Sequence, residues 1–438
     1  DYLHYLTSNH PPAGAMDLVG FFFRRNFNLL RQQGCMVLIA TKTIAEGVTR
    51  EGCLDVLTKE GIIYWAYKSI PWPGSAAVSV SLVAIRKTQN AQLFILNGKE
   101  TARISPYLDD SMIVGNPQVL AQNVGKSYEG SKVYGSGFVL DPAIADALIQ
   151  KNKRNKDVLF PYLNGDDLNS RPDGSPSRWV INFFDWPLRR KTEIDIVHAE
   201  DKYELAPSGY TGPVAEDYPD CLSIIERLVK PVREKDNRQA YKEKWWIYGE
   251  KRPGLYRAIA EVDRVIVIAA QAAKYTLFSF QKKEIVFSNA LVVIAHNAVS
   301  IFCLLSSSIH DNWCWRFGST LKGFLRYAST DVFETFPFPD CLRPGHPIDE
   351  VEEGLRGELE AAGKVYYEER AELMRRLNLG LTKTYNLFHD PDLDEAQLVT
   401  VLAKSGGTGT AAEMLARILR LRDLHVAMDK VVLRAYGW

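Results

Sequence analysis

The spacing of apolar residues predicts alternating helices and strands in the first part of the chain. Apolar side chains at helical spacing occupy the stretch 17–30, namely Val19, Phe22, Phe23, Phe27 and Leu30. This stretch is therefore predicted to be an amphipathic helix. The wholly apolar run 35–40 predicts a short strand of the kind that is buried in a parallel sheet. A helix near 50–60 and strands near 62–67 and 78–85 would complete the closing half of an open α/β sheet, which ends in a hairpin.

A second region of mixed helices and strands follows the basic run 151–156, which comes after a predicted helix at 142–150. Strand-like segments lie at 179–183, 264–270, 275–280 and 285–295, with a helix at 221–229. The polar, turn-rich stretch 191–216 is typical of a surface insertion. Together these signals predict an α+β domain over residues 158–340.

The C-terminal region, residues 341–438, has the pattern of long amphipathic helices. They are predicted at 351–377 and 411–436, with a Gly- and Thr-rich loop at 405–410. The many charges of the first helix are typical of a solvated face. A helical hairpin or bundle is predicted here, and the chain divides into three parts at 1–157, 158–340 and 341–438.

Composition and charge leave the partner open. The 438 residues fit two or three domains of ~100–200 residues each. Lys plus Arg and Asp plus Glu both number 53, so the net charge is zero. This balance does not exclude nucleic acid as a partner, because a basic cleft can be offset by acidic helices elsewhere.

Cysteine usage and hydropathy indicate where the protein works. The six cysteines form no Cys-x-x-Cys pair, which argues against a structural zinc site and against a disulfide framework. No apolar run approaches the ~20 residues that a membrane-spanning helix needs. We therefore expect a cytoplasmic protein with no membrane partner.

Two segments interleave aromatic and basic residues in a way that suits DNA. In the first, the candidate DNA-binding residues are Lys244, Trp245, Trp246, Tyr248 and Arg252. Ammonium and guanidinium groups can neutralise phosphates while rings stack on bases or sugars. The same pattern also fits two core tryptophans beside a basic surface turn, and the sequence leaves both interpretations open.

The second segment, residues 310–327, combines hydroxyls, glycines and cations. Its candidate DNA-binding residues are Arg316, Ser319, Thr320, Lys322 and Arg326. Such side chains suit phosphate and base-edge contacts. An ordinary loop between core elements is the alternative. If DNA is the partner, both segments are expected to line one positively charged groove in the 158–340 domain.

These segments resemble the type IIL (MmeI-like) family of fused restriction–modification enzymes and related single-chain adenine methyltransferases. The resemblance runs through most of the chain. It rests on late methyltransferase motifs at 17–25, 38–44, 47–51 and 72–74, on recognition-domain motifs at 160–168, 179–187 and 245–246, and on closing motifs at 331–339 and 381–391. The order and number of these motifs together are specific. The resemblance implies the C-terminal half of a Rossmann-like methyltransferase sheet, followed by an α+β target-recognition domain and a C-terminal helical region.

By resemblance, the intact protein transfers a methyl group from S-adenosylmethionine to the adenine amino group at a specific site in double-stranded DNA, after flipping the base out. The family's glycine-rich cofactor loop and its Asn-Pro-Pro-aromatic loop lie upstream of the point where this chain starts. Asn9-His-Pro-Pro12 has the wrong spacing and is predicted to be a plain loop. No catalytic, cofactor-binding or metal-binding residue is therefore assigned, and the chain alone is expected to lack the chemical step.

Two alternatives follow from the missing half. The chain is a piece of a longer methyltransferase that retains DNA recognition, or it is a non-enzymatic specificity or scaffold subunit of a split restriction–modification or phage-defence system. In the second case it would dock on a separate chain that supplies the N-terminal methyltransferase half. An open sheet edge near residues 35–40 would support such docking, because an unpaired strand of buried type invites another strand.

Overall fold

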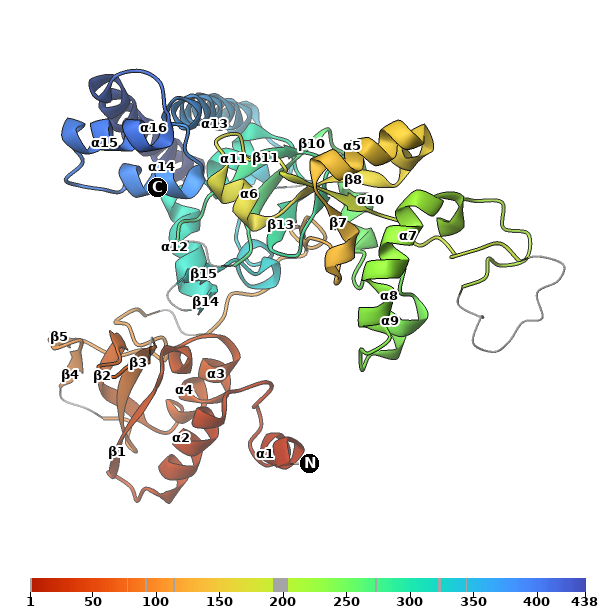
Figure 1. Ribbon diagram of the computed structural model, residues 1–438. Helices are drawn as coiled ribbons and strands as arrows, with labels where there is room; N and C mark the ends of the chain where they lie inside the picture. Colours follow the sequence, from red (N-terminus) through yellow and green to blue (C-terminus); the bar gives the residue numbers. More distant parts are fainter. Residues whose placement is uncertain are drawn as a thin grey trace. The chain divides into compact units, whose positions relative to one another are not determined.

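The chain forms two compact units in a computed structural model of residues 1–438 (Figure 1). The described residues are 2–76, 78–90, 93–112, 115–191, 204–271, 274–321, 324–343 and 345–438. Unit 1 comprises residues 1–120, 272–274 and 312–336, and unit 2 comprises residues 121–271, 275–311 and 337–438. Residues 312–336 thus pack with the N-terminal part of the chain, although sequence analysis placed them in the middle region.

Unit 1 is an α/β unit built around a five-stranded sheet with the order β1-β3-β2-β4-β5. Its first elements are α1 (Tyr2–Asn9), α2 (Leu18–Leu29), β1 (Cys35–Thr41), η1 (Lys42–Ala45), α3 (Gly47–Gly52), α4 (Leu54–Leu57), β2 (Ile62–Pro71), β3 (Ser79–Arg86), β4 (Phe94–Leu96) and β5 (Lys99–Thr101). The later segment adds the hairpin β14 (Ser319–Leu321) and β15 (Phe324–Arg326) and the helical turn η6 (Ser329–Phe333).

The predicted hairpin at the end of this sheet is confirmed. Strand β3 pairs antiparallel with both β1 and β2, so β1 and β2 run in the same direction on either side of it. Helices α3 and α4 lie in the connection between β1 and β2, where a single helix over 50–60 was predicted. The break falls at Cys53, whose φ of −119° and ψ of −82° are not helical.

Strand β1 forms as predicted, but the expectation that it is buried is wrong. It is the last strand of the sheet, and only Met36 and Ala40 are buried along it. Val37 and Ile39 on the opposite face are 56% and 47% exposed. An apolar run does not by itself distinguish a central strand from an edge strand, because pairing depends on segments that are distant in sequence.

Helix α2 also forms as predicted, with a different buried face. Phe21, Phe23 and Phe27 enter the core of unit 1, whereas Phe22 is 64% exposed. The loop that follows α1 is held by the Arg24 guanidinium of α2, which donates hydrogen bonds to the carbonyls of His10 and Pro12 at 2.7 and 3.1 Å. The prediction of a plain loop at Asn9–Pro12 is consistent with this arrangement.

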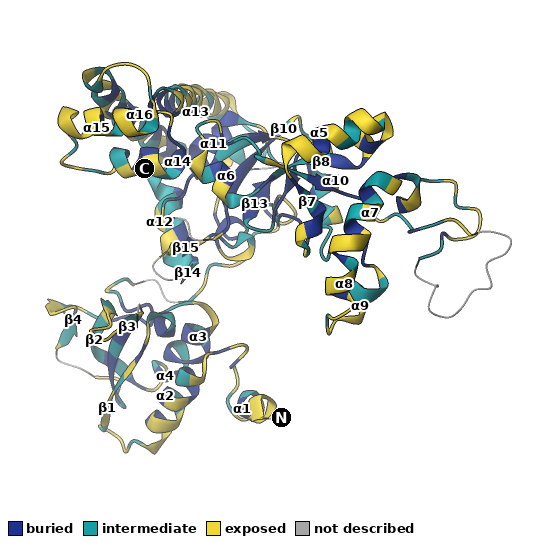
Figure 2. Ribbon diagram, viewed as in Figure 1, coloured by how far each residue is buried: buried dark blue, intermediate teal, exposed yellow. Residues whose placement is uncertain are grey.

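Unit 2 contains two four-stranded sheets, with the orders β11-β10-β13-β6 and β12-β8-β9-β7. The strands are β6 (Ser127–Glu129), β7 (Val139–Leu140), β8 (Leu159–Leu163), β9 (Arg178–Ile181), β10 (Arg264–Ala269), β11 (Ser279–Lys282), β12 (Val286–Phe287) and β13 (Leu291–Ile294). The helical elements among them are η2 (Ser136–Phe138), α5 (Pro142–Lys151), η3 (Lys153–Asp157), α6 (Gly165–Ser170), η5 (Ala215–Asp217), α7 (Pro219–Leu228), α8 (Lys230–Arg233), α9 (Gln239–Glu243) and α10 (Pro253–Ala260). Figure 2 shows buried residues concentrated along the strands and exposed residues on the outer faces of α5 and α7.

The predicted strands of this region are present with shifted limits. The single strand expected at 285–295 is two strands, β12 and β13, which belong to different sheets. A turn separates them, in which the amide of Leu291 bonds the carbonyl of Ser288. The insertion expected at 191–216 falls partly on residues 192–203, which lie outside the described residues.

The C-terminal part of unit 2 is helical, as predicted. Its elements are α11 (Val299–Leu305), α12 (Ser308–Phe317, which ends in unit 1), η7 (Asp340–Leu342), α13 (Glu350–Leu377), α14 (Leu381–Phe388), α15 (Glu395–Ser405) and α16 (Ala411–Ala435). Side chains including Leu373, Leu398 and Ile418 are fully buried, so α13–α16 share a core as a bundle. Among the described residues, no helix is both long and apolar enough to cross a membrane.

Candidate nucleic-acid interface

The aromatic residues of the first candidate segment lie in the core of unit 2. Trp245 is 4% exposed, Trp246 1% and Tyr248 5%. Trp246 donates a hydrogen bond from its indole nitrogen to the carbonyl of Trp186 at 2.9 Å. Rings buried to this degree cannot stack on DNA, so the core interpretation holds for these three residues.

The cations of the same segment differ from one another. Lys244 is exposed and has no ion pair with a described residue. Arg252 is ion-paired with Glu129 and Glu250, both at 2.6 Å. Lys251 contacts Asp185. Lys244 is therefore the candidate cation of this segment that is best placed to meet a phosphate.

A buried arginine holds this segment in place. Arg233, at the end of α8, is 1% exposed and donates hydrogen bonds to the carbonyls of Val133, Tyr134, Lys244 and Ile247 at 2.6–3.2 Å. Burial lowers its pKa to about 10, so it stays protonated near neutral pH. Sequence analysis missed this residue, because a lone arginine in a charged helix gives no signal of burial.

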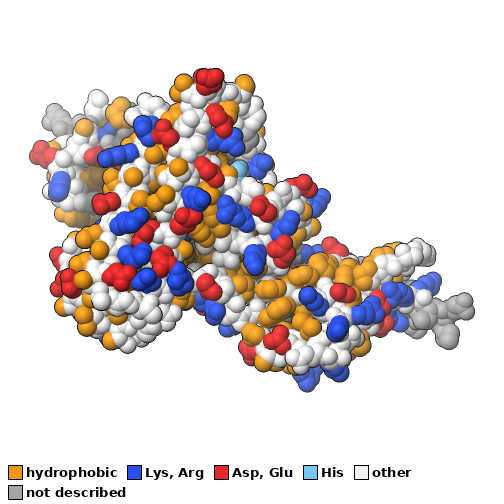
Figure 3. All heavy atoms as spheres, turned by 90° about the horizontal axis from the view of Figure 1, so that it is seen from above, with side chains coloured by type: hydrophobic (Ala, Val, Ile, Leu, Met, Phe, Trp, Pro, Cys, Tyr) orange, Lys and Arg blue, Asp and Glu red, His pale blue; other side chains and the backbone are white. Residues whose placement is uncertain are grey.

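Helices α7–α9 present further cations around Lys244. We call residues 219–244 the basic arm. Apart from the buried Arg233, it carries four lysine and arginine side chains that make no ion pair with a described residue: Arg227, Lys235, Lys242 and Lys244. The exposed carboxylate of Glu234 is likewise without an ion pair. Figure 3 shows that positive and negative side chains are intermixed over the face drawn there. A DNA contact on this face would therefore involve a few cations rather than one broad basic surface.

The second candidate segment belongs to unit 1. Arg316 forms an ion pair with Asp109 and lies over the ring of Tyr107, with its guanidinium carbon 4.7 Å from the ring centre. Burial raises the pKa of Asp109, but hydrogen bonds from Ser105, Ser111 and Arg316 outweigh it and lower that pKa below its ordinary value. Arg316 thus has an internal electrostatic role.

The neighbours of Arg316 are divided between internal and exposed positions. The Thr320 hydroxyl donates to Glu46 at 2.7 Å and contacts Lys42, whereas Ser319 pairs with Arg326 in the β14–β15 hairpin. Arg326 is exposed and has no ion pair with a described residue. Lys322 lies outside the described residues. The two candidate segments occupy different compact units.

Unit 1 also holds a cavity of about 590 Å³ at the end of the sheet where β1 and β2 finish. Residues that directly follow β1, such as Glu46 and Arg50, line it. Ligands of open α/β sheets typically bind at the carboxyl ends of the strands. Arg50 is 2% exposed, bonds Asp55 at 3.3 Å and stacks on Tyr107 at 3.8 Å. Of the charged residues that line this cavity, Arg50, Glu51 and Arg316 are in ion pairs, whereas Lys42, Glu46, Lys68 and Asp331 make no ion pair with a described residue.

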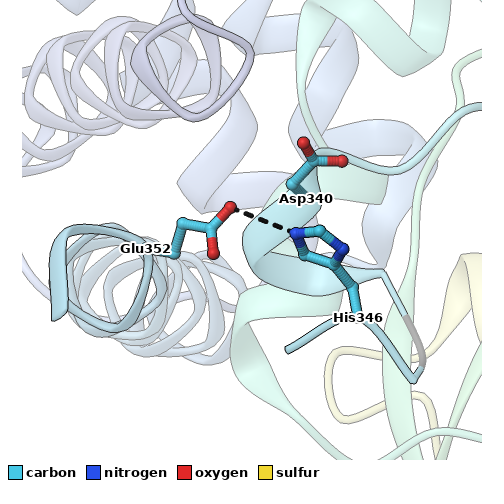
Figure 4. A group of neighbouring side chains, drawn as sticks. All are labelled: Asp340, His346 and Glu352. Carbon is cyan, nitrogen blue, oxygen red and sulfur yellow. Dashed lines mark ion pairs between the residues drawn. The ribbon is translucent and has the colours of Figure 1, made fainter. Parts of the chain in front are cut away.

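A cluster of possible metal ligands occurs at the start of the helical region. Asp340, His346 and Glu352 place their ligand atoms within 4.8 Å of one another (Figure 4). His346 lies 3.5 Å from Glu352, and Arg343 contacts both Asp340 and His346 at 3.0 Å. Glu352 also caps α13. A cation already lies within this group and its ligand atoms are engaged, so the arrangement is that of an ion-pair network.

Comparison with known proteins identifies the middle of the chain. Residues 215–340 match the family described as MmeI, target recognition domain. These residues form an MmeI-type target recognition domain. The match includes the whole of the basic arm with Arg233, whereas Val133 and Tyr134, to which Arg233 donates, lie outside it. Its last part, residues 312–336, packs in unit 1.

The fold of the whole chain is similar to that of MmeI. The structure of the Type IIL restriction–modification enzyme MmeI in complex with DNA matches with a TM-score of 0.69 at 18% identity. The match covers 99% of this chain and 51% of that chain, so this chain spans about half the length of the MmeI chain. The type IIG restriction endonuclease BpuSI (TM-score 0.30, 13% identity, 99% and 51% covered) and the DrdV–DNA complex (0.31, 9%, 100% and 54%) are far less similar. A comparison with curated proteins finds no match.

Proposed function

We propose that this chain recognises a specific site in double-stranded DNA for a restriction–modification enzyme, and that the modification is methylation of adenine. The observation that carries the proposal is the MmeI-type target recognition domain at residues 215–340, which includes exposed cations without ion pairs. The similarity in fold to MmeI, a structure solved with DNA, supports it.

The physical role of the basic arm is to bind the DNA backbone. Arg227, Lys235, Lys242 and Lys244 have no carboxylate partner that a phosphate would have to displace. Each neutralised phosphate of duplex DNA releases counterions and adds ~0.9 to the salt dependence of binding. Such contacts orient the protein on DNA, and base contacts from other residues then provide sequence specificity.

The methylation step is proposed for the larger assembly and not for these residues alone. S-adenosylmethionine is the cofactor that the resemblance implies. Two arginines that line the cavity of unit 1, Arg50 and Arg316, are ion-paired with Asp55 and Asp109, and the cofactor loop that the resemblance implies matches no residues of this chain. We therefore assign no step of the reaction to residues of this chain.

The edge of the unit 1 sheet favours a second candidate function, that of a specificity or scaffold subunit. Strand β1 has one neighbour, and Val37 and Ile39 on it are exposed. An exposed apolar edge strand is an available template for another strand. A separate chain that carries the methyltransferase half could pair there, which would make this protein the DNA-reading subunit of a split system.

The proposal is tested by binding measurements on the full chain. We expect duplex DNA to bind with an affinity that falls steeply between two salt concentrations, and we expect no heat signal when S-adenosylmethionine is titrated alone. Salt-independent or undetectable binding to a pool of random-sequence duplexes would contradict DNA recognition. Tight binding of S-adenosylmethionine would contradict the assignment of the cofactor site to residues outside this chain.

A further inference from the structure

Unit 2 contains a cavity of about 420 Å³ that has a different character from the cavity of unit 1. Its walls are mostly apolar and include four aromatic side chains: Phe160 of β8, Phe184 after β9, Tyr248, and Tyr256 of α10. Cavities that bind small molecules span ~300–1,000 Å³ and combine apolar walls with a few convergent polar groups. This cavity therefore has the size and the lining of a ligand site.

Two of its lining residues carry polar groups that lack a full set of partners. The Tyr248 hydroxyl is buried and makes no hydrogen bond. Asn182 is 8% exposed; its side-chain oxygen accepts a hydrogen bond from the Phe184 amide at 2.9 Å, and its NH₂ group bonds no described residue. A buried hydroxyl without a partner costs roughly 1–3 kcal/mol, so it is an unusual feature of a folded core.

The backbone beside the cavity is strained at two places. Phe184 has a φ of +53° and Arg252, which lies between the lining residues Lys251 and Pro253, has a φ of +55°. Bulky residues rarely adopt this left-handed conformation, and strain of this kind concentrates at functional sites. Phe184 is nonetheless 40% exposed, so its ring remains accessible at the cavity.

We propose that this cavity binds a single nucleobase, and that the base is one displaced from the DNA that the recognition domain holds. The proposal rests on the proposed function. The rings of Phe160 and Phe184 meet edge to face, with centres 5.6 Å apart. The 40% exposed ring of Phe184 supplies a stacking surface, and the NH₂ group of Asn182 supplies a hydrogen bond for the edge of a planar heterocycle. Flipped bases are read by this combination of stacking and edge hydrogen bonds. Arg257, which is exposed and has no ion pair with a described residue, lies at the cavity and suits the attached phosphate.

The test uses the fluorescent nucleoside 2-aminopurine deoxyriboside, whose emission falls when it stacks on an aromatic ring. We expect saturable quenching by the full chain with an affinity in the millimolar range or tighter. Phe184→Ala should weaken binding about tenfold by removing one wall, since stacking contributes ~1–3 kcal/mol per base. Asn182→Ala, which removes the lining amide, should weaken it a few-fold. The control Trp438→Ala removes an aromatic that is 74% exposed elsewhere and should change nothing.

Competition experiments distinguish a base displaced from DNA from a free nucleoside as the ligand of this cavity. A duplex with one unpaired base should displace the nucleoside better than a fully paired duplex, while labelled duplex binding is measured separately. No quenching by the wild type, or quenching unchanged in both cavity variants, would overturn the proposal. Displacement by neither duplex, although both bind, would overturn the assignment to a DNA base and leave a free-nucleoside site. Failure of both duplexes to bind at all would instead contradict the proposed function.

Discussion

Residues 244–252 and 312–326 both interleave aromatic and basic residues. The structure buries the aromatic side chains in the first segment and pairs a cation internally in the second. In the first segment the aromatic residues Trp245 and Trp246 are buried and Lys244 is exposed. In the second, Trp315 is 39% exposed while the cation Arg316 is ion-paired with Asp109. Interleaved aromatic and basic residues therefore do not define an interface by themselves. A side chain is available to DNA only if it is neither buried in the core nor paired with a carboxylate.

The largest effect is expected from Arg233→Met, because this change removes the buried arginine that bonds the carbonyls of Lys244 and Ile247. Its four carbonyl partners would lose charge-assisted hydrogen bonds, each worth ~1.5–3 kcal/mol. We expect the free energy of unfolding of unit 2 to fall by at least ~3 kcal/mol, measured by urea denaturation. Arg227→Met, at an exposed arginine of the same arm that makes no ion pair with a described residue, is the control and should have little effect. An equal effect of both would show that Arg233 has no special role.

Acid is expected to destabilise unit 2 more than unit 1. Burial lowers the pKa of His296 to about 4, helped by Lys126 and Arg356 and opposed by Glu360. As the pH falls, this histidine binds a proton at a higher pH in the unfolded chain than in the folded chain. The free energy of unfolding is therefore at its full value above pH ~6.5 and falls as the pH drops toward 4. At ~1.4 kcal/mol per pKa unit, the full effect is roughly 3 kcal/mol.

Hydrogen exchange read by mass spectrometry resolves the two units and checks this prediction. Protection in unit 2 should decline between pH 6.5 and 4, after correction for the intrinsic exchange rate. His296→Gln should make that decline shallower, and the buried His310 of unit 2, whose pKa burial lowers to about 3, should account for what remains. In unit 1, His4 is exposed and His10 is only partly buried, so a smaller change is expected there. An unchanged pH profile in His296→Gln would rule out this histidine as the cause.

Arg316→Ala is expected to have a smaller effect. It should lower the free energy of unfolding of unit 1 and leave the affinity for DNA nearly unchanged. The substitution leaves the partly buried Asp109 without its cation, which we expect to cost unit 1 about 1–2 kcal/mol. Duplex affinity should change less than twofold when measured at a temperature where the variant is folded. A loss of affinity without a loss of stability would restore Arg316 as a direct DNA contact, as the sequence pattern first suggested.

The smallest expected effect is that of single exposed cations. Lys244→Ala should weaken duplex binding a few-fold and reduce the salt slope by ~0.9, the value for one phosphate contact. Glu234→Gln removes a repulsive carboxylate from the same arm and should strengthen binding slightly. Fluorescence anisotropy with a labelled duplex at several salt concentrations measures both. If both variants bound the duplex with the wild-type affinity, this arm would not face DNA.

Much of the secondary structure could be predicted from sequence, because helix and strand periodicities are local. The hairpin of β2 and β3, helix α5 and the long helices α13 and α16 follow from such patterns. The exposure of β1 and the packing of 312–336 with the N-terminal part could not be predicted, because both depend on pairing between distant segments. The resemblance to MmeI was found in the sequence and is confirmed by the domain match and the fold.

The candidate site was predicted less well than the fold, for a physical reason. Lys244 and Arg326 are exposed as a DNA-binding role requires, but Trp245, Trp246 and Tyr248 belong to the core. Sequence shows which residues can contact a phosphate or a base, whereas burial and ion pairing determine which of them are free to do so. The cavity around Phe184 had no sequence signal, since its walls come from four separate segments.

The most direct test of this account is the salt dependence of duplex binding by the wild type and by a variant with Arg227, Lys235, Lys242 and Lys244 all changed to Gln. If the basic arm binds phosphates, the slope of log affinity against log salt should fall by up to ~3.6, at ~0.9 per contact. The variant should keep the wild-type free energy of unfolding, because all four side chains are at the surface. An unchanged slope in a folded variant would contradict the claim that this arm carries the DNA contact.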